Sequence, residues 1–116
     1  MRQLLSIIFL TLLISTPAFA ISDGNQLEKY CEEVDIKDKS SSNYFASGAC
    51  LGYLQAVMAS LTRTAENKIC PPENGISVDQ ARKIVLKNLK NHPETLHEHP
   101  YVIISASLLV VFPCVK

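Results

Sequence analysis

The fold follows most directly from residues 101–112, YVIISASLLVVF, an apolar run that only two serines interrupt. Its β-branched residues favour a strand. A run of this length without a turn signal, however, is long for a strand and ordinary for a buried helix. We therefore predict a central helix from about Pro93 to Phe112, apolar on most of its sides. Pro93 is expected at its first position, and Pro100 either kinks the helix or marks its true start.

Two further helices are predicted in the first half of the chain, over residues 25–34 and 43–64, with a serine-rich loop over residues 38–43 between them. The longer helix carries an apolar stripe of Cys50, Leu54, Val57 and Leu61. It also carries a stripe of small residues, which are Ala49, Gly52, Ala56 and Ala59. Gly48 and Gly52 each cost about 1 kcal/mol of helix propensity, so we expect a neighbouring helix to pack closely on this side of the helix; the alternative is a frayed first turn.

The remaining helix is predicted to begin after Ser77, because Gln80 stands three residues further on and completes a capping box. Its apolar residues share one face, and its basic residues are expected to lie mostly away from that face. These basic residues are Arg82, Lys83, Lys87 and Lys90. The whole pattern predicts an all-α fold, a small disulfide-stapled bundle of about four main helices.

The first twenty residues have the pattern of a signal peptide. Arg2 supplies a positive charge, residues 4–14 are almost wholly apolar, and Ala18-Phe19-Ala20 fits the cleavage motif. The apolar run is shorter than the about 20 residues that a membrane span requires, and an uncleaved anchor is the alternative. We predict a signal peptide over residues 1–20 and a single helical domain over residues 21–116, which folds outside the cytoplasm.

The charge balance of the chain limits the classes of partner that it is expected to bind. The chain has 11 basic and 11 acidic residues and no formal net charge, which favours neither a nucleic acid nor a membrane surface as the partner after signal cleavage.

Four cysteines in a short exported domain indicate two disulfides. The alternative is a metal site of four thiolates, but the paired C-x-x-C spacing typical of such sites is absent.

Helix order predicts how the cysteines pair. The last two predicted helices are joined by a short turn, so they should be antiparallel neighbours. Cys70 precedes the first of them and Cys114 follows the second, so these two residues should meet. Cys31 lies late in the first helix and Cys50 early in the second. We therefore predict the disulfides Cys31–Cys50 and Cys70–Cys114.

Catalytic patterns are weak. The cysteines are expected in disulfides, and no G-x-S-x-G elbow is present. The serines of the apolar run, Ser105 and Ser107, are expected to bond a backbone carbonyl one turn back. His92, His97 and His99 are not spaced four apart as two ligands on one helical face would be, so we interpret them as a helix cap and two partly exposed polar residues. We predict no enzyme activity, no metal and no cofactor, although a thiol- or metal-dependent enzyme remains a minor alternative.

An ordered set of short motifs resembles a known family. The set runs from Gly48-Ala49-Cys50-Leu51-Gly52-Tyr53 through Ile69-Cys70-Pro71-Pro72 and Gly75-Ile76-Ser77 to His92-Pro93-Glu94, His97 and Phe112-Pro113-Cys114. With the signal peptide in front, it is similar to the Rap/Tai family of periplasmic immunity proteins. The likeness covers about Cys31 to Cys114. The sequence departs from the family at Ala56, Pro72 and Pro100.

The resemblance implies a periplasmic protein that protects a bacterium against a type VI secretion amidase. The partner would be a papain-like, NlpC-type peptidoglycan amidase that cuts between D-glutamate and diaminopimelate. The immunity protein would be a homodimer that occludes the active-site cleft and performs no chemistry. The alternative is a periplasmic scaffold or adaptor with this fold and no toxin partner.

Two segments are candidates for the partner-binding surface. The loop from Arg63 to Gly75 carries charges, two prolines and Cys70, as a rigid presenting loop would; the alternative is an ordinary connection between helices. Its candidate partner-binding residues are Arg63, Glu66, Asn67, Glu73 and Asn74. The second candidate is the turn from Lys90 to His99.

Overall fold

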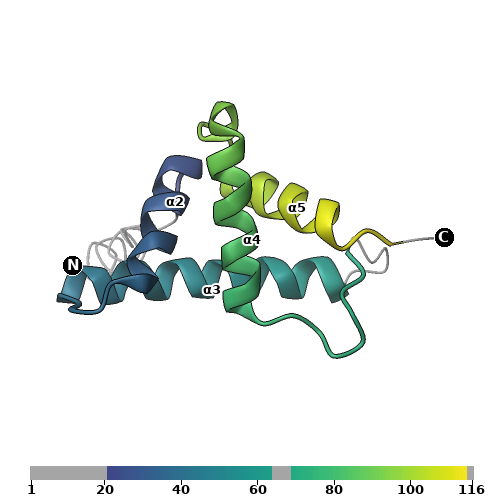
Figure 1. The fold of residues 1–116 in the computed structure, drawn as a ribbon, viewed down its shortest axis with the longest axis horizontal. Coiled ribbons are helices and arrows are strands. Elements are labelled where there is room, and N and C mark those ends of the chain that lie inside the picture. Colours follow the sequence, from purple (N-terminus) through teal and green to yellow (C-terminus); the bar gives the residue numbers. More distant parts are fainter. Residues whose placement is uncertain (1–20, 64–68, 115–116) are drawn as a thin grey trace, which may run out of the picture.

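Four α-helices form the fold, and a computed structural model describes them over residues 21–63 and 69–114. They are α2 (Gly24–Glu32), α3 (Ser41–Arg63), α4 (Val78–Asn91) and α5 (Pro100–Val111) (Figure 1). Two single-turn 3₁₀ helices, η1 (Glu33–Asp35) and η2 (Pro93–Thr95), follow α2 and α4. No strand occurs within the described ranges, and the predicted all-α class is confirmed. The predicted signal peptide, residues 1–20, lies outside these ranges.

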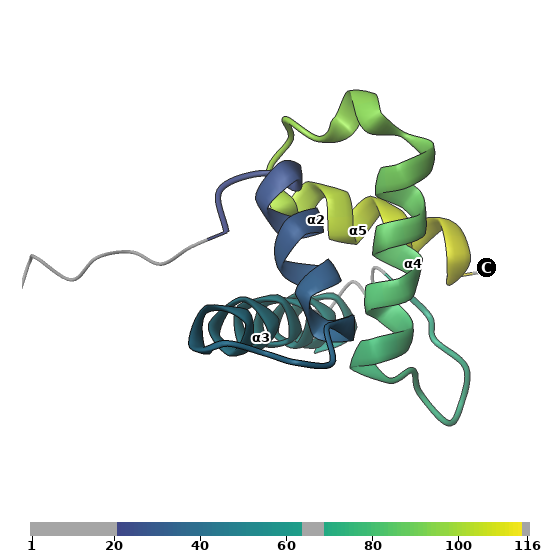
Figure 2. The same ribbon diagram turned by 60° about the vertical axis from the view of Figure 1, so that its left-hand side comes forward.

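The longest helix, α3, is the base on which the others pack. In Figures 1 and 2, α2, α4 and α5 all lie on the same side of α3, and α4 crosses it steeply. Each of the three contacts α3, and α4 also contacts α2 and α5. The core lies where they converge, and its fully buried side chains include Leu27, Leu54, Val85, Leu89, Ile104 and Leu108. The apolar stripe predicted for residues 43–64 faces this core.

The prediction of a central helix from Pro93 to Phe112 is wrong for α5, although the helix is apolar on most of its sides as predicted. The helix begins at Pro100, which is buried, and residues 93–99 form η2 and an irregular connection instead. Pro93 opens η2 rather than a longer helix. Only one face of α5 is in the core, and its other face leaves Val110 80% exposed. The apolar run is therefore a surface as well as a core element.

Local signals in the sequence set the helix starts. The Ser77 hydroxyl accepts a hydrogen bond of 3.0 Å from the backbone N–H of Gln80, as predicted for the start of α4. The Asp23 carboxylate caps α2 in the same way. His99 caps α5, because its Nδ1 accepts from the Tyr101 backbone N–H at 3.2 Å. The predicted loop over residues 38–43 is shorter than expected, since α3 already begins at Ser41.

Two disulfides tie the helices together, and both predicted pairings are confirmed. Cys31–Cys50 joins the end of α2 to α3, and Cys70–Cys114 joins the segment before α4 to the segment after α5. Closing a loop of either size is worth about 2–4 kcal/mol. All four cysteines are thereby used, and none is free.

By length and composition alone, α3 could cross a membrane. That test is also passed by a core helix of a domain. Cys50, Leu54, Val57 and Leu61 of α3 are buried against the other helices, and Cys50 is bonded to α2. Four apolar side chains of α3 are thus accounted for by the core, whereas Tyr44 and Phe45 are exposed.

The glycines do not serve the predicted role. Among the described residues, a Cβ added at Gly48 or Gly52 would have nothing within 4 Å, so no described helix packs closely on either glycine. The close approach occurs instead at Gly24. A Cβ there would lie 2.6 Å from Cδ1 of Ile103 and 2.8 Å from the carbonyl oxygen of Leu96. The Gly24 backbone N–H also donates to the Glu98 carbonyl, so the start of α2 is seated against the connection before α5.

Substitution of Gly24 by alanine should therefore destabilise the protein. The added methyl collides with backbone as well as a side chain, so we expect a loss of about 1–3 kcal/mol of unfolding free energy. The matched control is Gly52→Ala, which relieves a helical glycine in open space and should stabilise by about 0.5–1 kcal/mol. Urea denaturation measures both. Equal effects of the two substitutions would contradict the close approach at Gly24.

Candidate partner-binding surface

The segment between α3 and α4 is held at both of its described ends. Ile69 is 2% exposed and belongs to the core. Cys70 is bonded to Cys114, and its backbone N–H donates to the Phe112 carbonyl at 2.9 Å. At the other end, Ile76 packs against the core just before the Ser77 cap. The connection is therefore anchored to the ends of α4 and α5.

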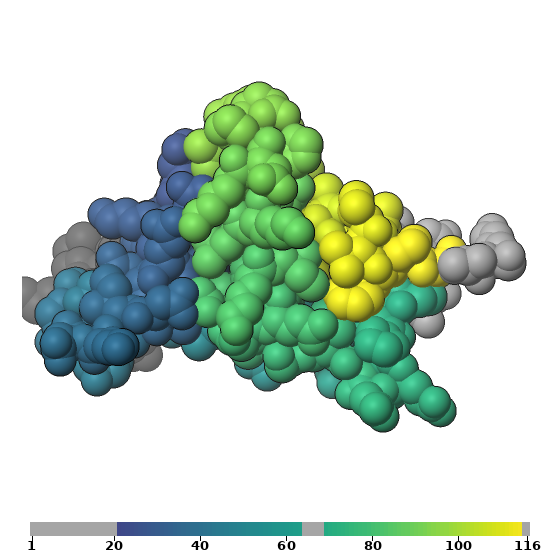
Figure 3. Space-filling model, viewed as in Figure 1, coloured from purple at the N-terminus to yellow at the C-terminus, as the bar shows by residue number. Residues whose placement is uncertain are grey.

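Between these anchors the chain makes a tight turn that projects from the body. The Gly75 backbone N–H donates to the Pro72 carbonyl at 2.7 Å, and Gly75 has a φ of +74° that a residue with a Cβ adopts with strain. Glu73 and Asn74 occupy the tip and are exposed. The space-filling view shows this segment standing out below α4 (Figure 3). The result is a protruding, internally constrained tip, which we call the anchored loop (residues 69–77).

The predicted partner-binding residues are brought together only in part. Glu73 and Asn74 share the tip of the anchored loop. Arg63 is the exposed last residue of α3. Glu66 and Asn67 lie outside the described residues. The described part of the surface thus rests on two adjacent side chains and the turn that carries them.

The second candidate surface, from Lys90 to His99, lies at the opposite end of α4 from the anchored loop (Figure 1). Its groups are bonded mainly to the protein itself. The Lys90 ammonium is 3.6 Å from a Glu32 carboxylate oxygen. His92 Nδ1 is 3.1 Å from a Glu94 carboxylate oxygen. Hydrogen bonding to its own backbone N–H and to His92 lowers the pKa of the Glu94 carboxyl.

The serines of the apolar run differ in their hydrogen bonds. The Ser107 hydroxyl donates to the Ile103 carbonyl at 2.7 Å, as predicted, and accepts from Asn88 at 2.8 Å. The prediction is wrong for Ser105, whose buried hydroxyl has no hydrogen-bond partner in the part of the chain that the structure describes. Over residues 21–63 and 69–114, no three histidine, cysteine or acidic residues converge on a point that could hold a metal ion.

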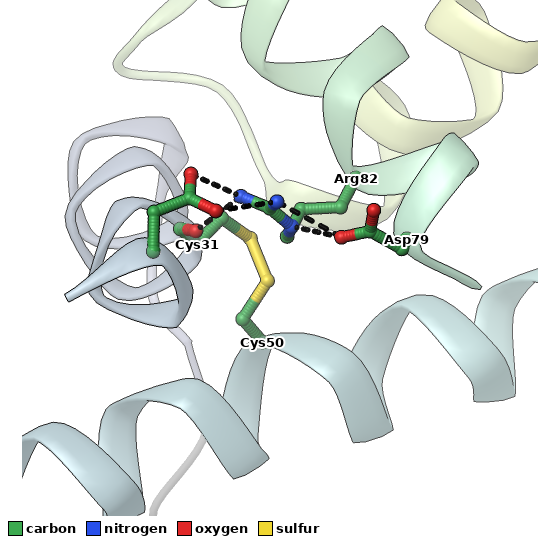
Figure 4. The surroundings of a disulfide bond; sticks show 5 residues. Cys31, Cys50, Asp79 and Arg82 are labelled. Carbon is green, nitrogen blue, oxygen red and sulfur yellow. Dashed lines mark hydrogen bonds and ion pairs between the residues drawn. A yellow bond between two sulfur atoms is a disulfide. The ribbon is translucent and has the colours of Figure 1, made fainter. Parts of the chain in front are cut away.

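The predicted position of one basic residue of α4, Arg82, is wrong. It was expected away from the buried face of α4, but its side chain is only 2% exposed. Its guanidinium donates two bonds of 3.0 Å to the Asp35 carboxylate and one of 2.9 Å to the Asp79 carboxylate. It also donates to the Cys31 carbonyl at 3.0 Å. Figure 4 shows the guanidinium beside the Cys31–Cys50 disulfide, between α2, η1 and α4.

The surroundings of Arg82 explain how a cation can be buried there. A buried charge is tolerated when it is paired and hydrogen-bonded, and here the planar guanidinium meets one carboxylate with two parallel bonds. Hydrogen bonding to Arg82 lowers the pKa of the Asp35 and Asp79 carboxyls below the ordinary value of 3.8. The spacing of Asp79 and Arg82 on one helix was the only available signal, since Asp35 is far away in sequence.

The fold and surface define a small, disulfide-stapled, all-helical domain with an anchored, protruding loop. Its sequence matches the family model of the Rap1a immunity proteins over residues 23–114. The chain therefore belongs to the Rap1a immunity protein family, a family of inhibitors rather than enzymes. A search of curated proteins finds no match. The disulfides and the family together indicate an exported protein that binds a cognate effector.

Replacement of Arg82 by methionine should destabilise the domain, because the Cys31 carbonyl and two carboxylates lose their donor. We expect a loss of about 2–3 kcal/mol. The control is Lys83→Met on the same helix, since Lys83 is exposed and contacts only Asp79 among the described acids; its effect should stay within about 0.5 kcal/mol. Urea denaturation at neutral pH compares the two variants. Equal losses would contradict the role of Arg82.

The same contacts should make stability depend on acid. Asp35 and Asp79 have lowered pKa values in the folded state, so the unfolded chain binds more protons near and below pH 4. Stability from these pairs is present above that pH and is lost as the pH falls through the folded values. The Arg82→Met variant should therefore lose less stability than wild type between pH 5 and pH 3. An identical pH profile for the two proteins would argue against this linkage.

Proposed function

We propose that this protein is a periplasmic immunity protein that binds a type VI secretion peptidoglycan amidase and occludes its active site. The family establishes an immunity protein. The amidase, its papain-like NlpC type and its cleavage between D-glutamate and diaminopimelate are implied by the resemblance of the sequence motifs. The proposed form is a homodimer that acts in the periplasm after removal of residues 1–20.

The observation that carries this proposal is the anchored loop. A segment that enters a narrow cleft binds most tightly if it is already ordered, because little conformational entropy is then lost. The disulfide, the backbone bond to Phe112 and the turn closed at Gly75 supply that order. Glu73 and Asn74 at the tip can donate or accept hydrogen bonds without leaving a buried group unpaired in the free protein.

Occlusion needs no chemistry from the inhibitor. A plug that fills the cleft excludes the peptide substrate, and the catalytic Cys–His pair of the amidase is never reached. This agrees with the bonds of Ser107, His92 and His99, which are made within the protein. Arg63, Glu66 and Asn67 are included in the proposed surface because they lead into the same loop.

Loss of the loop side chains should weaken inhibition. We expect the variant Glu66→Ala/Glu73→Ala/Asn74→Ala to lose at least tenfold in affinity for its amidase, with no change in its thermal midpoint. The measurement is inhibition of muropeptide cleavage by the amidase that co-purifies with the protein from periplasmic extract. The matched control is Asn91→Ala/Glu94→Ala/His97→Ala at the opposite end of α4, which should inhibit as wild type does.

The reverse result would contradict the proposal that the anchored loop binds the amidase. If the loop variant inhibits normally and the control variant does not, the surface over residues 90–99 is the binding surface. If neither protein nor variants bind any NlpC-type amidase, the scaffold alternative takes precedence.

Export should be required for protection. A version without residues 1–20 stays in the cytoplasm, away from the cell wall where the toxin cuts and away from the oxidising conditions that favour disulfides. We expect it to leave cells sensitive in a toxin-challenge assay, whereas the same domain behind an unrelated signal peptide should protect. Full protection by the cytoplasmic version would contradict the periplasmic site of action.

A further inference from the structure

The outer face of α5 is apolar and exposed along its whole length. Val102 is 50% exposed, Leu109 46% and Val110 80%. Ala106 lies between them and is exposed as well. No charged residue occurs anywhere in α5. The space-filling view shows the C-terminal half of the helix uncovered beside α4 (Figure 3).

These four residues form one continuous strip, which we call the α5 stripe (Val102, Ala106, Leu109 and Val110). Their spacing of i, i+4, i+7 and i+8 places them on a single face of the helix. The opposite face is fixed in the core by Ile103, Ile104 and Leu108. A contiguous apolar strip of this kind on an exported domain marks an interaction surface.

We propose that the α5 stripe is the surface through which two copies of this chain pair, with their α5 helices antiparallel. This deepens the proposed function, because it names the surface of the homodimer. A two-fold axis near Ala106 makes the stripe self-complementary, since Val102 of one copy then lies opposite Val110 of the other. The small side chain of Ala106 at the centre allows the two helices to approach closely.

Charge favours this partner and this direction. The C-terminal end of α5 is bordered by lysines of α4, because Lys83 and Lys87 line the same hollow as Val111, and Lys87 also lines one with Val110. The N-terminal end follows the segment that carries Glu94 and Glu98. An antiparallel pair brings the basic end of each copy toward the acidic end of the other. A parallel pair would place like charges together, which costs binding energy.

The first test compares two identical substitutions on exposed helical alanines of the whole exported chain. Ala106→Arg places a charge at the centre of the α5 stripe, and Ala56→Arg places one on the small stripe of α3. Sedimentation equilibrium of wild type should show a dimer. Ala106→Arg should raise its dissociation constant at least tenfold, and Ala56→Arg should leave it within twofold. If Ala106→Arg fails to fold by circular dichroism, Val110→Glu takes its place.

The second test checks the direction of pairing. Lys87→Glu and Glu98→Lys should each weaken the dimer about threefold or more, and the double variant should recover most of the loss. The control is Lys37→Glu, an exposed charge far from α5 in sequence, which should have no effect.

Several results would overturn the proposal. They are a monomeric wild type at 100 µM, a dimer that Ala56→Arg disrupts but Ala106→Arg does not, and a double charge variant whose losses simply add. Amidase inhibition by Ala106→Arg is measured separately. A monomer that still inhibits would leave the proposed binding and occlusion of the amidase intact and would contradict only the dimer, whereas a dimer that binds no amidase would contradict only the proposed occlusion.

Discussion

The buried guanidinium of Arg82 is the contact on which the arrangement of the helices most depends. It joins α4 to the carbonyl of Cys31 at the end of α2 and to Asp35 in η1. The Cys31–Cys50 disulfide beside it joins the same end of α2 to α3 (Figure 4). Three helices therefore meet at one point through one covalent bond and one fully paired cation. An ion pair of this kind specifies geometry, because its hydrogen bonds are satisfied in only one arrangement.

Much of the scaffold could be predicted from the sequence, because local signals decide it. The Ser77 cap, the periodicity of the apolar residues and the order of the cysteines predicted the first three helices and both disulfide pairings correctly. These features depend on near neighbours or on short connections between helices. Arg82 was misplaced because its partners Asp35 and Cys31 come from a distant part of the chain, and nothing in the spacing within α4 separates a buried arginine from an exposed lysine.

The errors on α5 and on the glycines have a common physical origin. Hydrophobicity reports that a side chain avoids water, but not whether its own chain or another one covers it. The apolar run of residues 101–112 was therefore interpreted as a central helix, although half of it is surface. Likewise, the small residues of α3 suggested close packing, whereas the tightest approach is at Gly24, where Leu96 and Ile103 meet the start of α2. Of the candidate partner-binding residues that the structure describes, Glu73 and Asn74 lie at the tip of the anchored loop and Arg63 does not.

The anchored loop separates the part of the sequence that must be kept from the part that is free to vary. Ile69, Cys70 and Ile76 attach it to the core, whereas Glu73 and Asn74 at the tip are exposed. Substitutions at the tip therefore leave the free energy of folding nearly unchanged. A lineage facing a new toxin can explore tip sequences without first acquiring compensating mutations in the core. On the proposed binding surface, recognition can therefore change quickly while the scaffold changes slowly.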